Sequence, residues 1–249
     1  MTRPLALVTG SYRRLGAHLA VRLAQAGWDI ALHATRDGEP DAAALATIAA
    51  AGADCHRFAA DLADPAAVRG LIPAVAARLG RPVTLLVNNA SCFRADDAAT
   101  PSPESLTAHF AVNAAAPFVL ATELAAQGGA AVVNILDQRI AHPPVDQLAY
   151  TLSKQALAEA TRTLALSLAP AVRVNGIAPG LTMPTPDYDA GQVERLAAMM
   201  PLGRLSTPDD IGDALIFLAH AQASTGQVVF VDGGAGLVRF DRDFVHLGR

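Results

Sequence analysis

The chain has 249 residues, of which 52% are hydrophobic and 17% charged, and its formal net charge is −4. This length suits one large α/β domain, residues 1–249, with a substantial core. The composition is ordinary for a compact soluble enzyme. The mildly acidic balance gives no sign of a nucleic-acid partner or of an anionic membrane surface.

The cellular compartment is indicated by the apolar runs, the first residues and the two cysteines. No apolar run approaches the ~18 residues of a membrane span, and the first residues lack the features of a signal peptide. Cys55 and Cys92 are isolated and have no metal-ligand spacing. We therefore expect a cytoplasmic protein with no disulfide framework and no metal site.

Short apolar runs alternate with longer helical patterns along nearly the whole chain. The first helical pattern places Leu15, Leu19, Leu23 and Ala26 on one face. Such alternation predicts βαβ units, a parallel sheet and helices on both faces, with the ligand crevice beyond the carboxyl ends of the strands. The expected strands are Leu5–Thr9, Asp29–His33, Asp54–Ala60, Val83–Asn88, Ala130–Leu136, Val172–Ala178 and Gln227–Val231.

Two irregular segments stand apart from this pattern. Leu181–Ala190 contains Pro184 and Pro186 and is too broken for a core element. We expect residues 181–200 to form a mobile flap over a site. The tail, residues 237–249, is short and charged.

The turn after the first expected strand has the character of a phosphate-binding loop. Gly10 permits a tight turn, and Gly16 allows close packing of a helix whose start offers N–H groups to a pyrophosphate. A plain glycine-bearing turn explains the same residues, since the fingerprint is incomplete. Arg14 stands where a glycine is expected, and Arg13 adds a second cation, which suits a more highly phosphorylated ligand.

The end of the second expected strand favours NADPH over NADH. An NAD-binding chain usually has an acidic residue there for the ribose hydroxyls. Here Arg36 takes that place, and Arg13 and His33 are expected to help it bind a 2′-phosphate. Asp37, one residue later, argues the other way, and a solvated loop charge is the alternative for Arg36.

The pair Tyr150 and Lys154 carries the catalytic signal. Their i, i+4 spacing puts a phenol and an ammonium on one helix face, and the cation is expected to lower the pKa of the phenol. Such a phenol suits proton donation. Asp137 precedes the tyrosine by thirteen residues, and an ionised carboxylate only accepts hydrogen bonds. Asp137 either joins this site or turns away to cap a helix or pair with Arg139.

The ordered motifs resemble those of the short-chain dehydrogenase/reductase family over nearly the whole chain. The matching residues are Thr9-Gly10, Gly16, Asp61, Asn89-Ala90, Asn113, Tyr150, Lys154, Pro179-Gly180 and Val231-Asp232-Gly233-Gly234. The resemblance implies a single Rossmann-type domain with a doubly wound seven-stranded parallel sheet, a nicotinamide cofactor and usually a homotetramer. It also implies that Tyr150 is the acid, that Lys154 holds the ribose, and that Asn113 supports a proton-relay water.

With the charged residues above, the resemblance gives a set of expected cofactor-binding residues. They are Gly10, Arg13, Arg14, Leu15, Gly16, His33, Arg36, Asp61, Leu62, Asn89, Ala90, Tyr150, Lys154, Pro179 and Gly180.

Three departures from the common family pattern resemble the pteridine reductase branch. Asp137 replaces a serine, Arg14 replaces a glycine, and Asn89-Ala90 continues with Ser91-Cys92-Phe93. In that branch the aromatic stacks on the pterin, the arginine and serine contact the substrate, and the aspartate joins the tyrosine in proton delivery. The implied substrate-binding residues are Arg14, Ser91, Phe93, Asp137, Tyr150 and Leu181. Taken singly, Phe93 as a lid aromatic and Ser91 as a turn former are the simpler interpretations.

The chemistry of Asp137 favours a C=N bond over a C=O bond. Hydride addition to a ketone builds negative charge on oxygen, which a carboxylate opposes. A protonated imine is cationic, and a carboxylate stabilises it. We therefore expect NADPH-dependent reduction of a dihydropterin, such as dihydromonapterin, dihydrobiopterin or dihydrofolate. The alternatives are a 3-oxoacyl-thioester or general ketone reductase, in which Ser91 or Ser153 replaces the missing donor, and a non-catalytic NADP-binding sensor.

Assembly is expected to follow the family as a homotetramer, with a dimer as the alternative. The apolar face Ala156, Leu157, Ala160, Leu164 and Leu168 and the small residues 114–116 suit pairing of helices between subunits, and equally packing within one monomer. Arg239 resembles a terminal arginine that reaches a neighbouring subunit's site in pteridine reductases.

Overall fold

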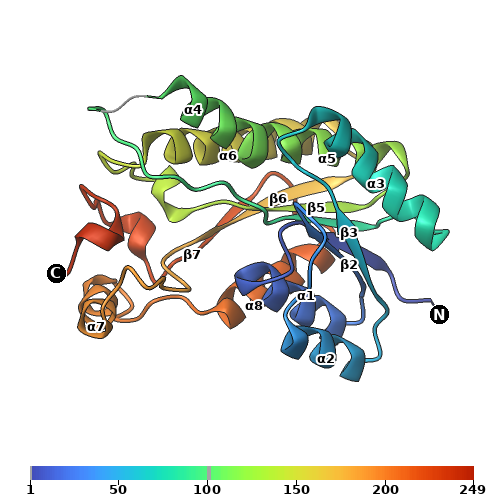
Figure 1. The fold of residues 1–249 in the computed structure, drawn as a ribbon, viewed down its shortest axis with the longest axis horizontal. Helices are drawn as coiled ribbons and strands as arrows, with labels where there is room; N and C mark the ends of the chain where they lie inside the picture. Colours follow the sequence, from blue (N-terminus) through green and yellow to red (C-terminus); the bar gives the residue numbers. More distant parts are fainter. Residues whose placement is uncertain (1, 100–101) are drawn as a thin grey trace.

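The computed structural model describes residues 2–99 and 102–249 and places seven parallel strands in one sheet (Figure 1). Their order is β3-β2-β1-β4-β5-β6-β7, so the chain reverses its direction of travel between β1 and β4. All seven expected strands are confirmed to within two residues at each end. Their bounds are β1 Leu5–Val8, β2 Asp29–Ala34, β3 Cys55–Ala59, β4 Leu85–Asn88, β5 Ala131–Ile135, β6 Arg173–Pro179 and β7 Val228–Val231.

Helices cover both faces of the sheet, as the alternating pattern predicts (Figure 1). One layer contains α3 Pro65–Leu79, α4 Pro103–Phe110, α5 Ala116–Ala126 and α6 Leu148–Ser167. The opposite layer contains α1 Arg14–Gln25, α2 Ala42–Ala50 and α8 Pro208–His220. The fold is therefore the doubly wound Rossmann type.

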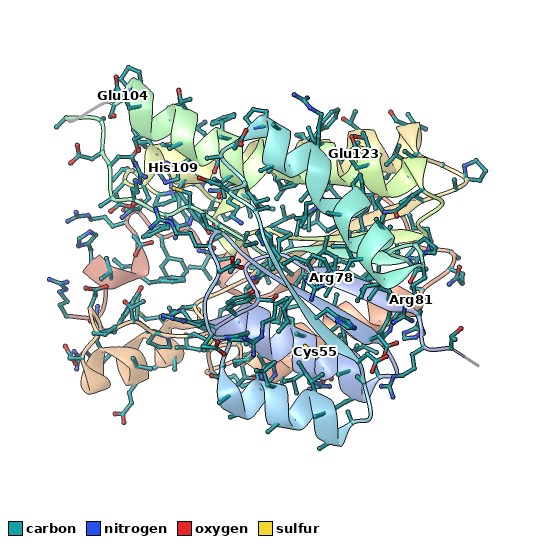
Figure 2. The ribbon with its side chains drawn as sticks, turned by 45° about the vertical axis from the view of Figure 1, so that its right-hand side comes forward. Cys55, Arg78, Arg81, Glu104, His109 and Glu123 are labelled. Atoms are coloured by element: carbon teal, nitrogen blue, oxygen red, sulfur yellow. The ribbon has the colours of Figure 1, made fainter. Side chains whose placement is uncertain are left out.

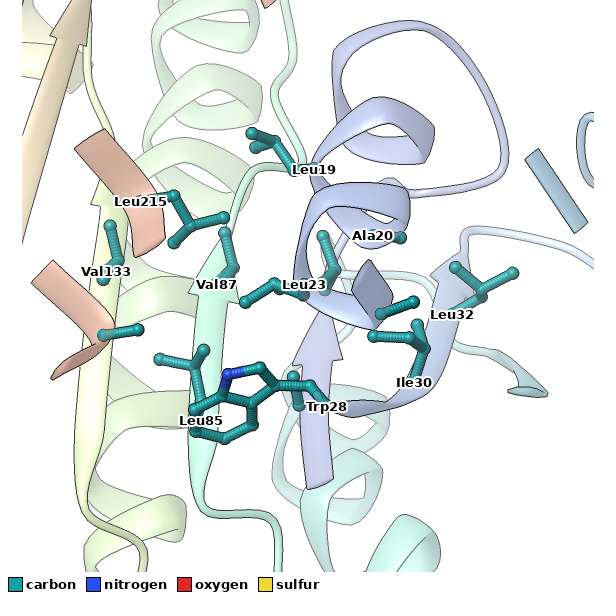
Figure 3. Packing of buried hydrophobic residues seen from close by; sticks show 14 of the residues in the cluster. Leu19, Ala20, Leu23, Trp28, Ile30, Leu32, Leu85, Val87, Val133 and Leu215 are labelled. Carbon is teal, nitrogen blue, oxygen red and sulfur yellow. The ribbon is translucent and has the colours of Figure 1, made fainter. Parts of the chain in front are cut away.

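The core explains why the strands are nearly continuous apolar runs. Leu19 and Leu23 of α1 pack against the sheet beside Leu85 and Val87, and Trp28 fills the space next to them (Figure 3). Strands covered on both faces must be apolar on both sides. Each fully buried leucine contributes roughly 1.5–3 kcal/mol. This packing therefore fixes the positions of the carboxyl ends of the strands, where the ligand crevice is expected.

The helix starts are specified locally. Asp64 caps α3 by accepting from the amide of Ala66, and Pro65 begins that helix. Thr207 and Asp210 form a capping box at the start of α8.

The helical segment 103–126 runs through α4, the π-helix η1 Ala111–Ala115 and α5. Within residues 2–99 and 102–249 it is the one helix long and apolar enough to cross a membrane, by length and composition only. In the fold, its α5 part packs against α3 and its α4 part against α6. Figure 2 shows His109 on this layer, where its ring accepts a hydrogen bond from the Arg94 amide at 3.1 Å.

The expected flap, residues 181–200, ends in a regular helix, α7 Ala190–Met199. Gln192 ties this helix to the tail, because its Nε2 donates to the carbonyls of Phe244, Val245 and Leu247. The tail itself contains two short 3-10 turns, η3 Ala235–Leu237 and η4 Phe244–His246. Flap and tail therefore form one packed unit beside the strand ends.

Candidate active site

The candidate site lies beyond the carboxyl ends of the strands, where the strand order reverses. A cavity of about 730 Å³ extends over β1, β2 and β4, and a second of about 350 Å³ lies over β5 and β6. The two cavities share Arg14, Leu15, Asn89 and Ser91 in their walls. This is the place where doubly wound sheets bind their ligands, and together the cavities form one long crevice.

The glycines of the first loop are required by close backbone packing. Gly10 has φ of +62°, and a Cβ there would lie 2.8 Å from the Cα of Ala90. A Cβ at Gly16 would overlap the carbonyl oxygen of Gly10. The Asn89 side chain donates to the carbonyls of Thr9 and Gly10, at 2.9 and 3.0 Å. Asn89 therefore locks the end of β4 to the loop.

The wall of the larger cavity suits a phosphorylated dinucleotide. Of the expected cofactor-binding residues, ten line it: Gly10, Arg13, Arg14, Leu15, Gly16, Arg36, Asp61, Leu62, Asn89 and Ala90. Arg13 and Arg36 are exposed, and among the described residues neither has an ion-pair partner. The glycine cradle and these two guanidiniums are fitting ligands for a pyrophosphate and a further phosphate.

His33 does not take the expected role at a 2′-phosphate. It is buried, its Nδ1 accepts the Gly10 amide at 3.2 Å, and its Nε2 lies 3.0 Å from the Ala60 carbonyl oxygen. Burial lowers the pKa of His33, which keeps the ring neutral. His33 therefore holds the loop in place. The expectation failed because sequence gives a position at a strand end but not the direction of its side chain.

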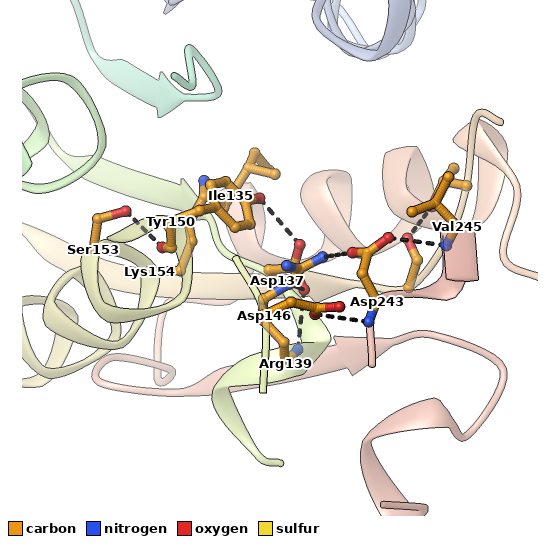
Figure 4. A network of polar contacts seen from close by, with 11 residues as sticks. Ile135, Asp137, Arg139, Asp146, Tyr150, Ser153, Lys154, Asp243 and Val245 are labelled. Carbon is orange, nitrogen blue, oxygen red and sulfur yellow. Dashed lines mark hydrogen bonds and ion pairs between the residues drawn. The ribbon is translucent and has the colours of Figure 1, made fainter. Parts of the chain in front are cut away.

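The second cavity brings Asp137 and Tyr150 together (Figure 4). The Tyr150 hydroxyl donates to Asp137 Oδ2 at 3.0 Å. Asp137 Oδ1 accepts from the backbone amide and from Nε of Arg139, both at 3.0 Å. Asp137 also caps the short 3-10 helix η2 Gln138–Ile140. Both interpretations of Asp137 therefore hold, one for each oxygen.

The pKa values of Tyr150 and Lys154 differ from those expected from sequence. Burial raises the pKa of Tyr150 well above its usual value, Asp137 raises it further, and the Arg139 guanidinium opposes this. The pKa of Tyr150 is therefore shifted upward, opposite to the lowering expected from Lys154. Lys154 Nζ donates to the Ile135 carbonyl at 2.8 Å, and burial lowers the pKa of Lys154 to about 8.

Asn113 does not face the crevice. Its Oδ1 accepts from the Cys92 amide and the Ser91 hydroxyl, while its Nδ2 donates to the Cys92 carbonyl and to Ser153 Oγ. All four hydrogen-bonding sites of the amide are thus used. The side-chain amide is therefore not available to the expected relay water, and support of such a water by the backbone carbonyl of Asn113 stays a prediction. Asn113 instead positions the loop that carries Ser91 and Phe93.

Ser153 is also removed from the substrate. It is fully buried, and its hydroxyl donates to the Tyr150 carbonyl at 2.7 Å. It is therefore not placed to replace the missing donor of a ketone reductase.

The expected substrate-binding residues meet around the second cavity. Arg14, Ser91, Phe93, Asp137, Tyr150 and Leu181 line it, together with Lys154, Pro179 and Gly180. The Phe93 ring is half exposed and meets the Tyr150 ring edge-on, with centroids 4.8 Å apart. Arg14 Nη2 donates to the Met183 carbonyl at 2.9 Å, which links the phosphate loop to the flap.

The wall contains further residues that the sequence analysis does not name as site residues, among them the polar and aromatic Arg139, Tyr188, Asp243 and Phe244. Arg139 was recognised only as an ion-pair partner, two positions beyond Asp137. The tail residues Asp243 and Phe244 lie about a hundred positions further along, and no motif marks them. A charged tail was the one available signal.

The sheet, the glycine-bearing turn at its switch point and the tyrosine–lysine pair define a nicotinamide-dependent oxidoreductase. A family model described as enoyl-(acyl carrier protein) reductase matches residues 10–236. The chain belongs to the short-chain dehydrogenase/reductase family, whose members use NAD(P).

Three similar proteins illustrate the range of that family. A FolM alternative dihydrofolate reductase 1 from Brucella suis, solved with NADP, has a TM-score of 0.88 and 36% identity, covering 96% of this chain and 98% of its own. Pteridine reductase 1 of Leishmania tarentolae is 32% identical over 96% of this chain and 98% of that protein. A putative ketoacyl reductase of granaticin synthesis from Streptomyces violaceoruber is 35% identical over 94% and 97%.

Proposed function

We propose that this enzyme reduces the C=N bond of a dihydropterin with NADPH. The observation that carries this proposal is Asp137, which presents one carboxylate oxygen to the Tyr150 hydroxyl while Arg139 holds the other. A carboxylate beside the acid suits a substrate that becomes cationic on nitrogen. The similarity to pteridine reductase 1 and to the FolM dihydrofolate reductase supports the same substrate class.

NADPH, when bound, supplies the hydride that adds to the ring carbon. Gly10 and Gly16 leave room for its pyrophosphate, Arg13 and Arg36 would bind the 2′-phosphate, and Lys154 would hold the ribose. These assignments favour NADPH over NADH because a doubly charged phosphate gains from two guanidiniums.

The proton goes to the ring nitrogen, so that reduction adds one hydride and one proton to the C=N bond. Tyr150 holds this proton at its phenol oxygen, and Asp137 accepts from the N–H groups of the pterin and stabilises the protonated imine. Phe93 would stack on the flat ring, and Arg14, Ser91 and Leu181 would complete its contacts. We place the enzyme in the cytoplasm, where NADPH is the reductant.

A substrate panel tests the proposal. NADPH oxidation is measured with dihydromonapterin, dihydrobiopterin, dihydrofolate and an acetoacetyl thioester, with Tyr150→Phe as the control for enzymatic turnover. We expect the dihydropterins to be reduced and the thioester to be ignored. The ketoacyl reductase relative makes a ketone the competing substrate. Turnover of the thioester alone would overturn the proposal.

Substitution of Asp137 tests its role directly. Asp137→Ser and Asp137→Asn should lower kcat with the dihydropterin by roughly 10²- to 10⁴-fold, the usual range for loss of acid–base assistance. The NADPH dissociation constant, measured by fluorescence, should change far less. Equal losses of turnover and of NADPH affinity would show that Asp137 is structural.

A further inference from the structure

Arg139 is a buried charge in the wall of the second cavity. Only 7% of the residue is exposed, and Figure 4 shows its guanidinium between Asp137 and Asp243. Its Nε donates to Asp137 Oδ1 at 3.0 Å, and its Nη2 donates to Asp243 Oδ2 at 2.7 Å. A planar fork of this kind fixes two carboxylates relative to each other, which a lysine cannot do.

The third guanidinium nitrogen of Arg139, Nη1, makes no hydrogen bond with the described residues that would compensate for its burial. Nη1 is buried and has no hydrogen-bond partner among the described residues. The guanidinium carbon instead lies 4.8 Å from the centre of the Tyr150 ring and 5.9 Å from that of Phe93. The charge is therefore packed directly against the two aromatic rings that line the substrate cavity.

Asp243 is itself firmly held. Its backbone amide donates to Asp146 Oδ1 and its Oδ1 accepts the amide of Val245, both at 2.9 Å. The other side of this tail is held by the three hydrogen bonds of Gln192. The tail therefore provides a rigid anchor for Arg139, from a position about a hundred residues away.

The charges of this buried group balance. Asp137 and Asp243 are two carboxylates, and Arg139 and Lys154 are two cations within the same wall. Tyr150 and Tyr188 face the same charges, and Asp146 lies behind Asp243 with Arg242 and His246 near its carboxylate. Without the Arg139 side chain, Asp137 Oδ1 would keep only the backbone amide of residue 139, so its orientation toward the phenol would be less firmly fixed.

We propose that Arg139, anchored by Asp243 of the tail, is a positioning residue that holds Asp137 in the orientation needed to work with Tyr150. Arg139 acts through Asp137 and does not touch the reacting atoms. The tail is thus part of the proton-delivery machinery. This inference rests on the proposed acid–base pair, but not on the identity of the substrate.

Asp243→Asn tests the anchor and Asp241→Asn is its matched control. The asparagine can still accept the Val245 amide, but it loses the ion pair with Arg139. Asp241 is two residues away and highly exposed. We expect Asp243→Asn to lower kcat by roughly tenfold to a hundredfold, the scale of a displacement of about 1 Å. The NADPH dissociation constant should stay within about twofold, and Asp241→Asn should behave like the wild type.

Arg139→Lys and Arg139→Gln test the fork itself. Lysine keeps the charge and glutamine does not, so kcat should fall in the order wild type, lysine, glutamine while NADPH affinity stays constant. If Arg139→Gln does not fold, the Asp243→Asn comparison decides alone. Equal kcat in Asp243→Asn and Asp241→Asn, or parallel losses of kcat and NADPH affinity, would overturn the inference.

The two proposals fail in different ways. Absence of dihydropterin turnover in the wild type contradicts the proposed function only. The same variants are then compared with whichever carbonyl substrate the panel reveals, because Tyr150 delivers the proton in either reaction. A normal kcat in Asp243→Asn with that substrate contradicts the inference.

Discussion

Tyr150 and Lys154 are buried side by side, yet burial shifts their pKa values in opposite directions. It raises the pKa of the phenol well above its usual value and lowers that of the ammonium to about 8. Burial away from water favours the neutral form of each group, which is the protonated phenol of Tyr150 and the deprotonated amine of Lys154. Lys154, with a pKa of about 8, is therefore the group of this pair that titrates closer to neutral pH.

Lys154 should make NADPH binding depend on pH. Below about pH 8 the ammonium is present and can hold the ribose hydroxyls; as the pH rises through about 8 it loses its proton. We expect NADPH affinity, measured by fluorescence between pH 6.5 and 9.5, to fall over that interval. Tyr150→Phe should keep this fall. Lys154→Met should bind NADPH weakly, and its affinity should not change over this pH interval. If the affinity of Lys154→Met still falls, a group other than Lys154 causes the pH dependence.

Arg36 and His33 separate cofactor choice from loop support. Arg36→Ala should weaken NADPH binding by roughly 1.5–3 kcal/mol, the value of hydrogen bonds to a charged group, and leave NADH binding unchanged. His33→Phe leaves the Gly10 amide and the Ala60 carbonyl unpaired, so it should weaken both cofactors equally. Both affinities are measured for both variants. A changed NADPH-to-NADH ratio in His33→Phe would restore its expected phosphate role.

Residue positions were predictable from sequence to the extent that they follow a strand end. Asp137, Tyr150 and Lys154 were placed correctly in one cavity because motif spacing and helix periodicity determine their side of the fold. His33 and Asn113 occupy equally regular positions, but their side chains point into hydrogen-bond networks inside the protein. Side-chain direction depends on neighbours from other elements, which local sequence does not contain.

At the scale of elements, the first residue of α1 has a strained backbone. Arg14 has φ of +52°, in the left-handed region that costs residues with a side chain about 1–2 kcal/mol. This explains physically why a glycine is expected there. The arginine is kept in this conformation while its guanidinium reaches the flap at Met183. Strain at a cavity wall is typical of functional positions.

Arg14→Gly and Arg14→Ala distinguish strain from contact. Both remove the guanidinium, but only glycine relieves the backbone. Arg14→Gly should therefore be more stable than Arg14→Ala by about 1 kcal/mol in denaturant unfolding, and both should raise KM for the dihydropterin. Equal unfolding midpoints would mean that the turn relaxes in solution. Unchanged KM would remove Arg14 from the substrate contacts.

At the scale of the whole molecule, the sheet was predictable and the closing unit was not. Strands buried on both faces show as continuous apolar runs, and their alternation with helices determines the topology. The flap and the tail have no such periodicity. Their structure depends on single long-range contacts, such as the pair between Arg139 and Asp243 across 104 positions.

The homotetramer expected from sequence remains a proposal, but the residues proposed for its interface differ from those expected from sequence. Leu157 and Leu164 of the expected apolar face are buried inside the monomer. Exposed apolar side chains of that layer include Leu106 on α4, Phe118 on α5, and Leu152 and Leu166 on α6. We propose a homotetramer that uses this layer. In sedimentation, Phe118→Glu with Leu166→Glu should reduce the assembly state, and an unchanged state would place the interface elsewhere.

The attachment of the tail to Gln192 has a practical consequence for handling the protein. Arg249 Nε donates to the carbonyl of Val245, so the last residue is bound to the same turn as Asp243 and Phe244. We expect a purification tag fused after Arg249 to disturb the turn that carries Asp243 and Phe244 of the cavity wall. The chain enters β1 on the side of the molecule opposite to the tail (Figure 1). Kinetic work on this enzyme should therefore use amino-terminal fusions.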